Sequence, residues 1–94
     1  MTYERMLSAK NDLELKLNRL EKQYWKYDAK ADAARSAGDA AEALRKDTKC
    51  VLLHKEQQTI LETLRLLGWD YRVEDREDPE VGTIYRYIVY SPYD

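Results

Sequence analysis

The sequence of 94 residues predicts an α+β fold that is mainly α: a long, coiled-coil-like antiparallel helical hairpin followed by a C-terminal two-stranded β-hairpin. Apolar residues recur in alternating steps of three and four on both sides of a short break at Gly38-Asp39, a pattern typical of two paired helices. After Gly68 the apolar period changes to the two-residue alternation of strands. At this length we expect a single domain over residues 1–94.

The first helix is predicted over residues 2–36, a segment that contains no Gly or Pro and is rich in strong helix formers. Gly38 supplies the left-handed conformation that ends such a helix. We call the apolar stripe along both helices the seam. In the first helix it consists of Leu13, Leu17, Leu20, Tyr24, Tyr27, Ala31 and Ala34.

The second helix is predicted over residues 40–67, with Asp39 and Glu42 close to a capping box at its start. A short turn makes the helices antiparallel, so residues whose numbers add to about 77 face each other, as Tyr24 and Leu53 do. The seam continues there as Cys50, Leu53, Gln57, Ile60, Leu64 and Leu67.

Two strands are predicted at residues 69–75 and 83–90, joined by a loop over 75–82. A two-stranded hairpin is marginal on its own and needs a surface to pack on. We expect it to pack on the nearest helix ends, at Tyr3, Met6, Leu7, Leu64 and Leu67.

Charge and composition narrow the class of protein. The chain has 16 basic and 18 acidic residues, a net charge of -2, which argues against a surface wholly devoted to nucleic acid. The single cysteine, Cys50, and the absence of a signal peptide or an apolar membrane span predict a cytoplasmic protein without membrane association.

Several apolar residues lie outside the seam and need a second surface to cover them. We interpret them as the face of a homodimer or helical bundle; a groove for a foreign protein and cover by the chain's own β-hairpin are the alternatives. The residues chosen for this face are Trp25, Leu44, Val51 and Leu52.

Tyrosine is the second unusual feature, with eight Tyr and no Phe in the chain. Tyr combines apolar area with a polar end, which suits binding surfaces. One face of the β-hairpin, bearing Tyr85 and Tyr87 or else Tyr90 and Tyr93, is the predicted contact surface. Packing of these rings on the helix ends is the alternative.

Acidic residues gather between the two predicted strands. We favour the hypothesis that they meet the basic surface of a nucleic-acid-binding protein, over a merely solvated loop or a weak divalent-cation site. The residues concerned are Asp75, Glu77, Asp78 and Glu80.

Catalytic and metal-binding patterns are weak. Cys50 and His54 lie four residues apart on one helical face, but two ligands do not make a zinc site. No nucleophile or phosphate-binding motif occurs, so we predict no enzyme activity, no metal and no cofactor.

A basic stripe on the first helix is a candidate for contacts with the phosphates of a nucleic acid. The alternative is a solvated helix face on which basic and acidic residues alternate. The stripe contains Lys16, Arg19, Lys22, Lys26 and Lys30.

These observations favour a non-enzymatic protein-interaction module with a basic protein partner. In its size, its acidic C-terminal part and its lack of catalytic motifs the chain is similar to small phage or mobile-element proteins that inhibit host defence nucleases, such as anti-CRISPR proteins. That resemblance implies an inhibitor acting by binding. The alternatives are a small dimeric nucleic-acid-binding regulator that uses the basic stripe, and a structural subunit of a coiled-coil assembly.

Overall fold

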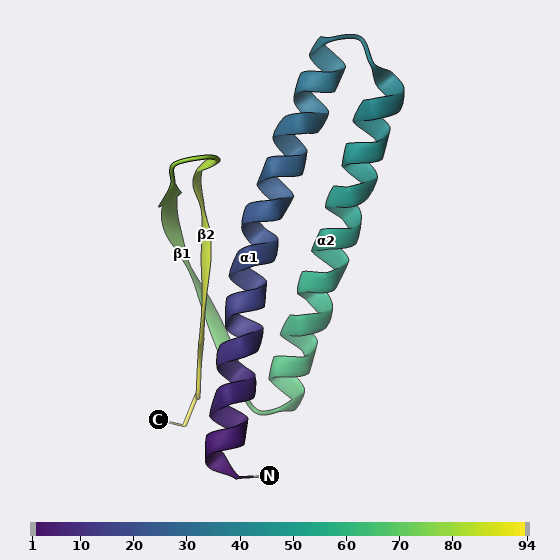
Figure 1. The fold of residues 1–94 in the computed structure, drawn as a ribbon. Helices are drawn as coiled ribbons and strands as arrows, with labels where there is room; N and C mark the ends of the chain where they lie inside the picture. Colours follow the sequence, from purple (N-terminus) through teal and green to yellow (C-terminus); the bar gives the residue numbers. More distant parts are fainter. Residues whose placement is uncertain (1, 94) are drawn as a thin grey trace.

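The computed structural model describes residues 2–93 and contains two long helices followed by an antiparallel β-hairpin (Figure 1). The elements are α1 (Tyr3–Ser36), α2 (Ala40–Leu66), β1 (Asp70–Asp78) and β2 (Gly82–Tyr90). In Figure 1 the hairpin lies on one side of α1 and α2 on the other, which makes α1 the middle layer of an elongated molecule measuring 53 × 23 × 16 Å. The predicted mainly-α fold class is confirmed, and both helices begin and end within one residue of the predicted bounds.

The turn between the helices is built as the sequence predicts. Gly38 has a φ of +76°, and at this end of α1 the N–H of Gly38 donates to the carbonyl of Arg35 at 3.1 Å and that of Asp39 to Ala34 at 2.9 Å. The Asp39 carboxylate in turn accepts the N–H of Glu42 at 3.0 Å, which starts α2. These bonds satisfy helix-end groups on both sides of the turn and hold the helices antiparallel.

The seam forms the core between α1 and α2. Leu17 and Leu64 are 0% and 1% exposed, and they belong to one cluster with other buried residues of both helices. Cys50 is buried in the seam, where its thiol donates to the backbone carbonyl of Tyr24 at 3.6 Å. The other helical members of the cluster are Leu20, Leu53, Ile60 and Leu61.

The connection from α2 to β1 fixes the base of the hairpin to the core. Gly68 has a φ of +91°, and the N–H of Trp69 folds back to the carbonyl of Leu64 at 2.9 Å. Trp69 and Val89 join the core cluster, against which Leu7 also packs. The prediction that the hairpin contacts the helix ends is therefore confirmed for Leu7 and Leu64. Tyr3, Met6 and Leu67 line a hollow together with Trp69, where Tyr3 and Leu67 stay 67% and 40% exposed.

The acidic loop is shorter than predicted, because β1 continues to Asp78 instead of ending at residue 75. The register pairs Asp75 with Tyr85 and Glu77 with Thr83, and only residues 79–81 form the turn. Charged side chains do not prevent this extension, because the backbone pairs with a β-branched and aromatic strand while the side chains of Asp75 and Glu77 stay exposed to solvent.

The hairpin also extends farther along α1 than predicted. Instead of packing only on the helix ends, β2 lies against α1, and the turn at the tip reaches Lys22 and Lys26 near the middle of that helix. Polar contacts between α1 and the hairpin accompany the burial of Ile84 and Val89, and an apolar pattern does not reveal which part of α1 they reach. Within residues 2–93, neither helix combines the length and apolar character needed to cross a membrane.

Candidate functional site

Asn18 on α1 fixes the position of β2. Its side-chain amide donates to the carbonyl of Tyr87 at 3.0 Å and accepts the N–H of the same residue at 2.7 Å. One turn earlier, the Glu14 carboxylate accepts the N–H of Val89 at 2.7 Å. These side chains pair the outer edge of β2, which otherwise presents open backbone groups. They also hold Tyr85 and Tyr87 beside the next turns of α1.

Ion pairs hold the tip of the hairpin to α1. The Lys22 ammonium lies 3.2 Å from the Asp78 carboxylate and 3.1 Å from that of Glu80, and Lys26 lies 3.1 Å from Glu80. The pKa of Asp78 is lowered, chiefly because its carboxylate accepts the N–H of Glu80, with Lys22 contributing. The pKa of Glu80 is lowered by Lys22 and then by Lys26. Two of the four acids predicted to bind a partner are thus engaged within the chain.

The other two predicted acids, Asp75 and Glu77, are exposed on β1. Glu77 accepts a hydrogen bond from the hydroxyl of Thr83 at 2.6 Å. The four acids therefore do not form one loop surface: Asp78 and Glu80 contact α1, whereas Asp75 and Glu77 face solvent on the strand.

A hollow forms where α1, α2 and β2 meet, and we call it the junction hollow. It has a volume of about 210 Å³ and contains three of the predicted site residues, namely Trp25, Tyr85 and Tyr87. The complete lining is Glu21, Tyr24 and Trp25 from α1, His54 and Gln57 from α2, and Tyr85 and Tyr87 from β2.

Glu21 is the unusual residue of the junction hollow, because it is a carboxylate only 5% exposed. Its two oxygens accept the indole N–H of Trp25 and the amide N–H of Gln57, each at 2.9 Å. Both donors are neutral. Among residues 2–93, no nitrogen of Lys, Arg or His lies within 4.0 Å of this carboxylate. The hollow therefore contains a buried acid without a basic partner in the described chain.

Aromatic rings surround this acid. Tyr24 and Trp25 pack edge to face, with ring centroids 5.1 Å apart. At the rim, Trp25 is 37% and Tyr85 51% exposed. Tyr87 is half-buried, and burial, followed by the nearby Glu21 carboxylate, raises the pKa of its hydroxyl to about 12. The site thus offers aromatic surface around a carboxylate and is open to solvent.

The residues predicted for an oligomer face are split by the structure. Leu44, Val51 and Leu52 lie on the solvent-facing part of α2 and are 54–67% exposed. Trp25 lies on α1, where it lines the junction hollow with β2. Trp25 is therefore separate from the other three residues.

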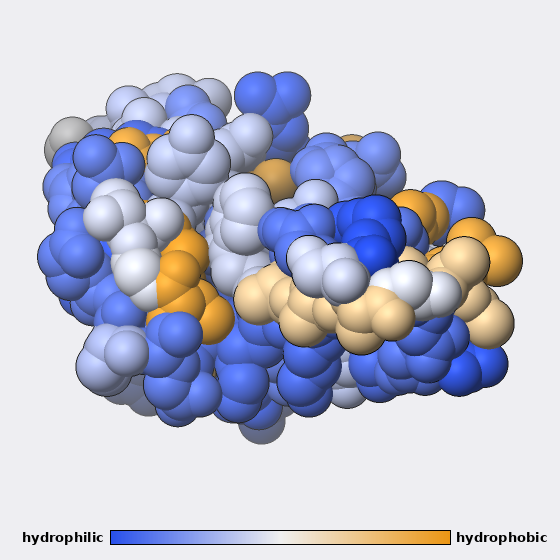
Figure 2. All heavy atoms as spheres, turned by 90° about the horizontal axis from the view of Figure 1, so that it is seen from above, coloured by the Kyte–Doolittle hydropathy of each residue, from blue (hydrophilic) through white to orange (hydrophobic). Residues whose placement is uncertain are grey.

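The view onto the helical turn shows a band of apolar residues amid hydrophilic ones (Figure 2). The alanines 33, 37, 40 and 41 are exposed at this end.

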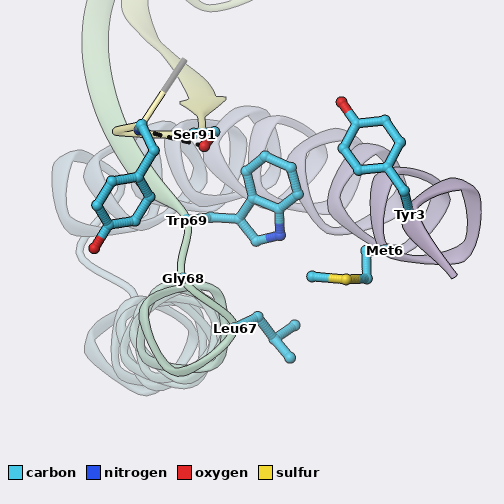
Figure 3. Close-up of a pocket in the computed structure, with 7 residues that line it drawn as sticks. Tyr3, Met6, Leu67, Gly68, Trp69 and Ser91 are labelled. Carbon is cyan, nitrogen blue, oxygen red and sulfur yellow. Dashed lines mark hydrogen bonds between the residues drawn. The ribbon is translucent and has the colours of Figure 1, made fainter. Parts of the chain in front are cut away.

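A second hollow, of about 230 Å³, opens at the other end of the molecule, between the start of α1 and the α2–β1 connection. Figure 3 shows the Trp69 indole there, with its nitrogen turned toward the side where Met6 and Leu67 lie. This nitrogen is buried and donates no hydrogen bond within residues 2–93. Tyr90 lines a different hollow beside this end, so it does not join Tyr85 and Tyr87 at the junction hollow.

Cys50 and His54 line a groove between α1 and α2. Burial, followed by Asp28 and Asp47, raises the pKa of the Cys50 thiol, so the thiol form is favoured over the nucleophilic thiolate. In the part of the chain that the structure describes, no three His, Cys, Asp or Glu side chains converge as metal ligands.

Four residues of the junction hollow were not predicted from the sequence as part of a binding site: Glu21, Tyr24, His54 and Gln57. One signal in the sequence, the polar residue Gln57, could have located the junction hollow. Gln57 stands in an apolar seam, and a buried amide needs a hydrogen-bond partner. Facing residues have numbers that add to about 77, which places Gln57 opposite residue 20, between Arg19 and Glu21. The structure shows that Glu21 is the partner.

Comparisons with known proteins give no further information about this site: no family model matches the chain, and neither a curated protein nor a solved structure shows significant similarity to it.

Proposed function

We propose that this chain is a non-enzymatic protein-interaction module that binds its partner through the aromatic surface around the junction hollow. The observation that carries the proposal is the exposure of two large aromatic side chains, Trp25 and Tyr85, beside the buried carboxylate of Glu21. Trp and Tyr are the residues most enriched among those that dominate binding energy in protein interfaces.

Rigidity supports the same proposal. The Trp25 indole is held by its hydrogen bond to Glu21 and by the Tyr24 ring. Tyr85 belongs to a strand whose edge is fixed by Asn18. A partner that binds here orders few additional rotamers, which lowers the entropic cost of association.

The proposed partner is a protein with a basic surface, because the exposed Asp75 and Glu77 and the carboxylate of Glu21 all carry the opposite charge. An inhibitor of a host defence nuclease, as in anti-CRISPR proteins, is one such function, and it is supported only by size and charge. A cytoplasmic location belongs to the proposal and is supported by the free, buried thiol of Cys50.

A peptide display selection on the immobilised chain tests this function and requires no identified partner. We expect enrichment of peptides that contain Lys or Arg, and loss of at least tenfold in their affinity for Trp25→Ala and Tyr85→Ala. Leu15→Ala, at an apolar residue of α1 that is 61% exposed and lines no part of the junction hollow, is the matched control and should bind as the unmodified chain does. Peptides that bind equally well to both aromatic variants would refute the proposed surface.

Self-association through α2 is a second candidate function, favoured by one observation. Four large apolar side chains on the solvent-facing part of this helix are more than half exposed: Leu44, Val51, Leu52 and Leu66. A homodimer or a subunit of a coiled-coil assembly would cover them. Sedimentation equilibrium should then show a dimer that Val51→Lys dissociates, and a monomer at high concentration would contradict this candidate.

The function of a dimeric nucleic-acid-binding regulator has weaker support, because several lysines of the basic stripe already form ion pairs with acidic residues of the chain. Lys22 and Lys26 pair with the hairpin tip, and Lys16 lies 2.9 Å from Glu56 of α2. This alternative requires nucleic-acid binding that weakens steeply with salt. A gel-shift titration at low salt measures it directly.

A further inference from the structure

We propose that the junction hollow binds an organic cation, namely the ammonium group of a lysine side chain, with or without methyl groups, or the guanidinium group of an arginine. The cation would lie between the Glu21 carboxylate and the aromatic rings. This inference rests on the proposed function, because it specifies the chemical group that a basic partner inserts into the site.

The unpaired charge of Glu21 is the first argument. Glu21 is only 5% exposed as a residue, so its carboxylate has little contact with water, and the neutral donors Trp25 and Gln57 supply hydrogen bonds but no opposite charge. Each oxygen retains capacity to accept a further hydrogen bond. A cation that enters the hollow would supply the missing opposite charge. The attraction of the Glu21 carboxylate would offset the cost of removing water from the cation.

The aromatic lining is the second argument, because rings attract cations through their negatively charged faces. The chain already uses this attraction elsewhere: the ammonium groups of Lys30, Lys46 and Lys49 lie 5.0, 5.6 and 5.8 Å from the Tyr27 ring centre. In contrast, no ammonium or guanidinium group within residues 2–93 lies over the ring of Trp25 or Tyr85. These rings remain available to a cation from outside the chain.

Size and access are the third argument. A volume of about 210 Å³ is several times the roughly 30 Å³ that one water occupies in the liquid. The acid lies deep while Trp25 and Tyr85 stand partly exposed at the rim, so an extended side chain can enter from solvent. A calcium or magnesium ion does not suit the same place, since these ions prefer several oxygen ligands and the hollow offers one carboxylate.

An NMR titration of the full chain tests the inference, with the indole N–H resonance of Trp25 as the readout. Choline and its neutral isostere 3,3-dimethyl-1-butanol have the same shape and differ in charge. We expect saturable, millimolar binding of choline and at least tenfold weaker binding of the isostere. Acetylated amides of lysine, trimethyllysine and arginine then distinguish a protein side chain from a small free cation as the source of the group.

Glu21→Gln removes the charge and can keep both hydrogen bonds if the Gln57 amide turns over. It should weaken choline binding at least tenfold, whereas Glu62→Gln, the same change at an exposed position of α2, should leave it unaltered. If Glu21→Gln fails to fold, the choline and isostere pair on the unmodified chain still decides. Equal binding of choline and its neutral isostere, or no binding of choline and of all three amino-acid amides, would overturn the inference. Loss of peptide binding in Tyr85→Ala but not in Glu21→Gln would overturn it too, while leaving the proposed function intact.

Discussion

The two faces of α1 differ in how they hold their neighbours. Toward α2, the helix presents the apolar seam. Leu17 and Leu20 are buried there in one cluster with Leu53 and Leu64 of α2. Toward the β-hairpin it presents Asn18 and other polar residues, which make hydrogen bonds and ion pairs with the strand edge and the tip. The apolar face supplies most of the burial, and the polar face determines where β2 lies.

This difference separates stability from recognition. The apolar seam gains free energy by burial, and most of its residues are already covered and cannot contact a partner. Leu67, the last residue of the seam, is the exception at 40% exposed. The polar face fixes geometry through directional contacts and leaves aromatic side chains exposed above it. Glu21 lies between the two faces, where it contacts Gln57 of α2 and Trp25 of its own helix. We therefore expect the two faces to respond differently to mutation.

The largest effect should come from the apolar face. Leu17→Ala removes a side chain that is 0% exposed and should lower the free energy of unfolding by about 3 kcal/mol, the sum of lost burial and a cavity. Urea unfolding followed by helical circular dichroism measures it. The control Leu15→Ala, on a residue 61% exposed on the same helix, should stay within about 0.5 kcal/mol of the unmodified chain. Similar losses in both variants would contradict the assignment of the seam.

On the polar face, Asn18→Ala should release the hairpin while the helices remain paired. The N–H and carbonyl of Tyr87 lose their partners, at a cost of about 1–3 kcal/mol. Hydrogen exchange should therefore accelerate at Tyr87 and Val89 and not at core amides of α2. Asn11→Ala, at an exposed position of α1, serves as the control. Uniform acceleration in all elements would mean that the two faces do not act separately.

Acid should loosen the hairpin tip in a narrow range of pH. The pKa values of Asp78 and Glu80 are lowered in the folded chain from their ordinary 3.8 and 4.5. Their stabilising contribution is thus complete above these ordinary values and is lost as the pH falls through the lowered ones. Protection factors of the Glu80 and Val81 amides, compared between about pH 5 and about pH 2.5, measure this. Asp78→Asn, which removes one of the two charges that Lys22 pairs with, should reduce the difference. Unaltered protection in acid would refute the role of the ion pairs.

The smallest effect concerns the thiol in the seam. Because burial raises the pKa of Cys50, little thiolate exists near pH 8, and iodoacetamide should alkylate the folded chain more slowly than the chain in denaturant. Mass spectrometry of timed samples gives both rates. Equal rates would show that this part of the seam opens readily.

The sequence predicts the helices and the seam well, because apolar periodicity and helix caps are local signals. It predicts the position of the hairpin poorly, since contacts such as that between Asn18 and Tyr87 join residues 69 positions apart and follow no period. For the same reason Trp25 and Tyr85 were identified as candidates but not as neighbours. Asp78 and Glu80 are acids whose role depends on Lys22 and Lys26, which only the docked strand brings within reach.

The central claim is that docking of β2 on the polar face of α1 creates the binding surface, and Asn18→Ala tests it most directly. Asn18 does not line the junction hollow, yet its loss should undock Tyr85 and Tyr87. In one NMR titration with a selected peptide, hairpin amide shifts report docking while the titration curve reports affinity. We predict that affinity falls at least tenfold as the hairpin is released and helical content is kept. Full affinity in a chain whose hairpin is released would contradict the claim.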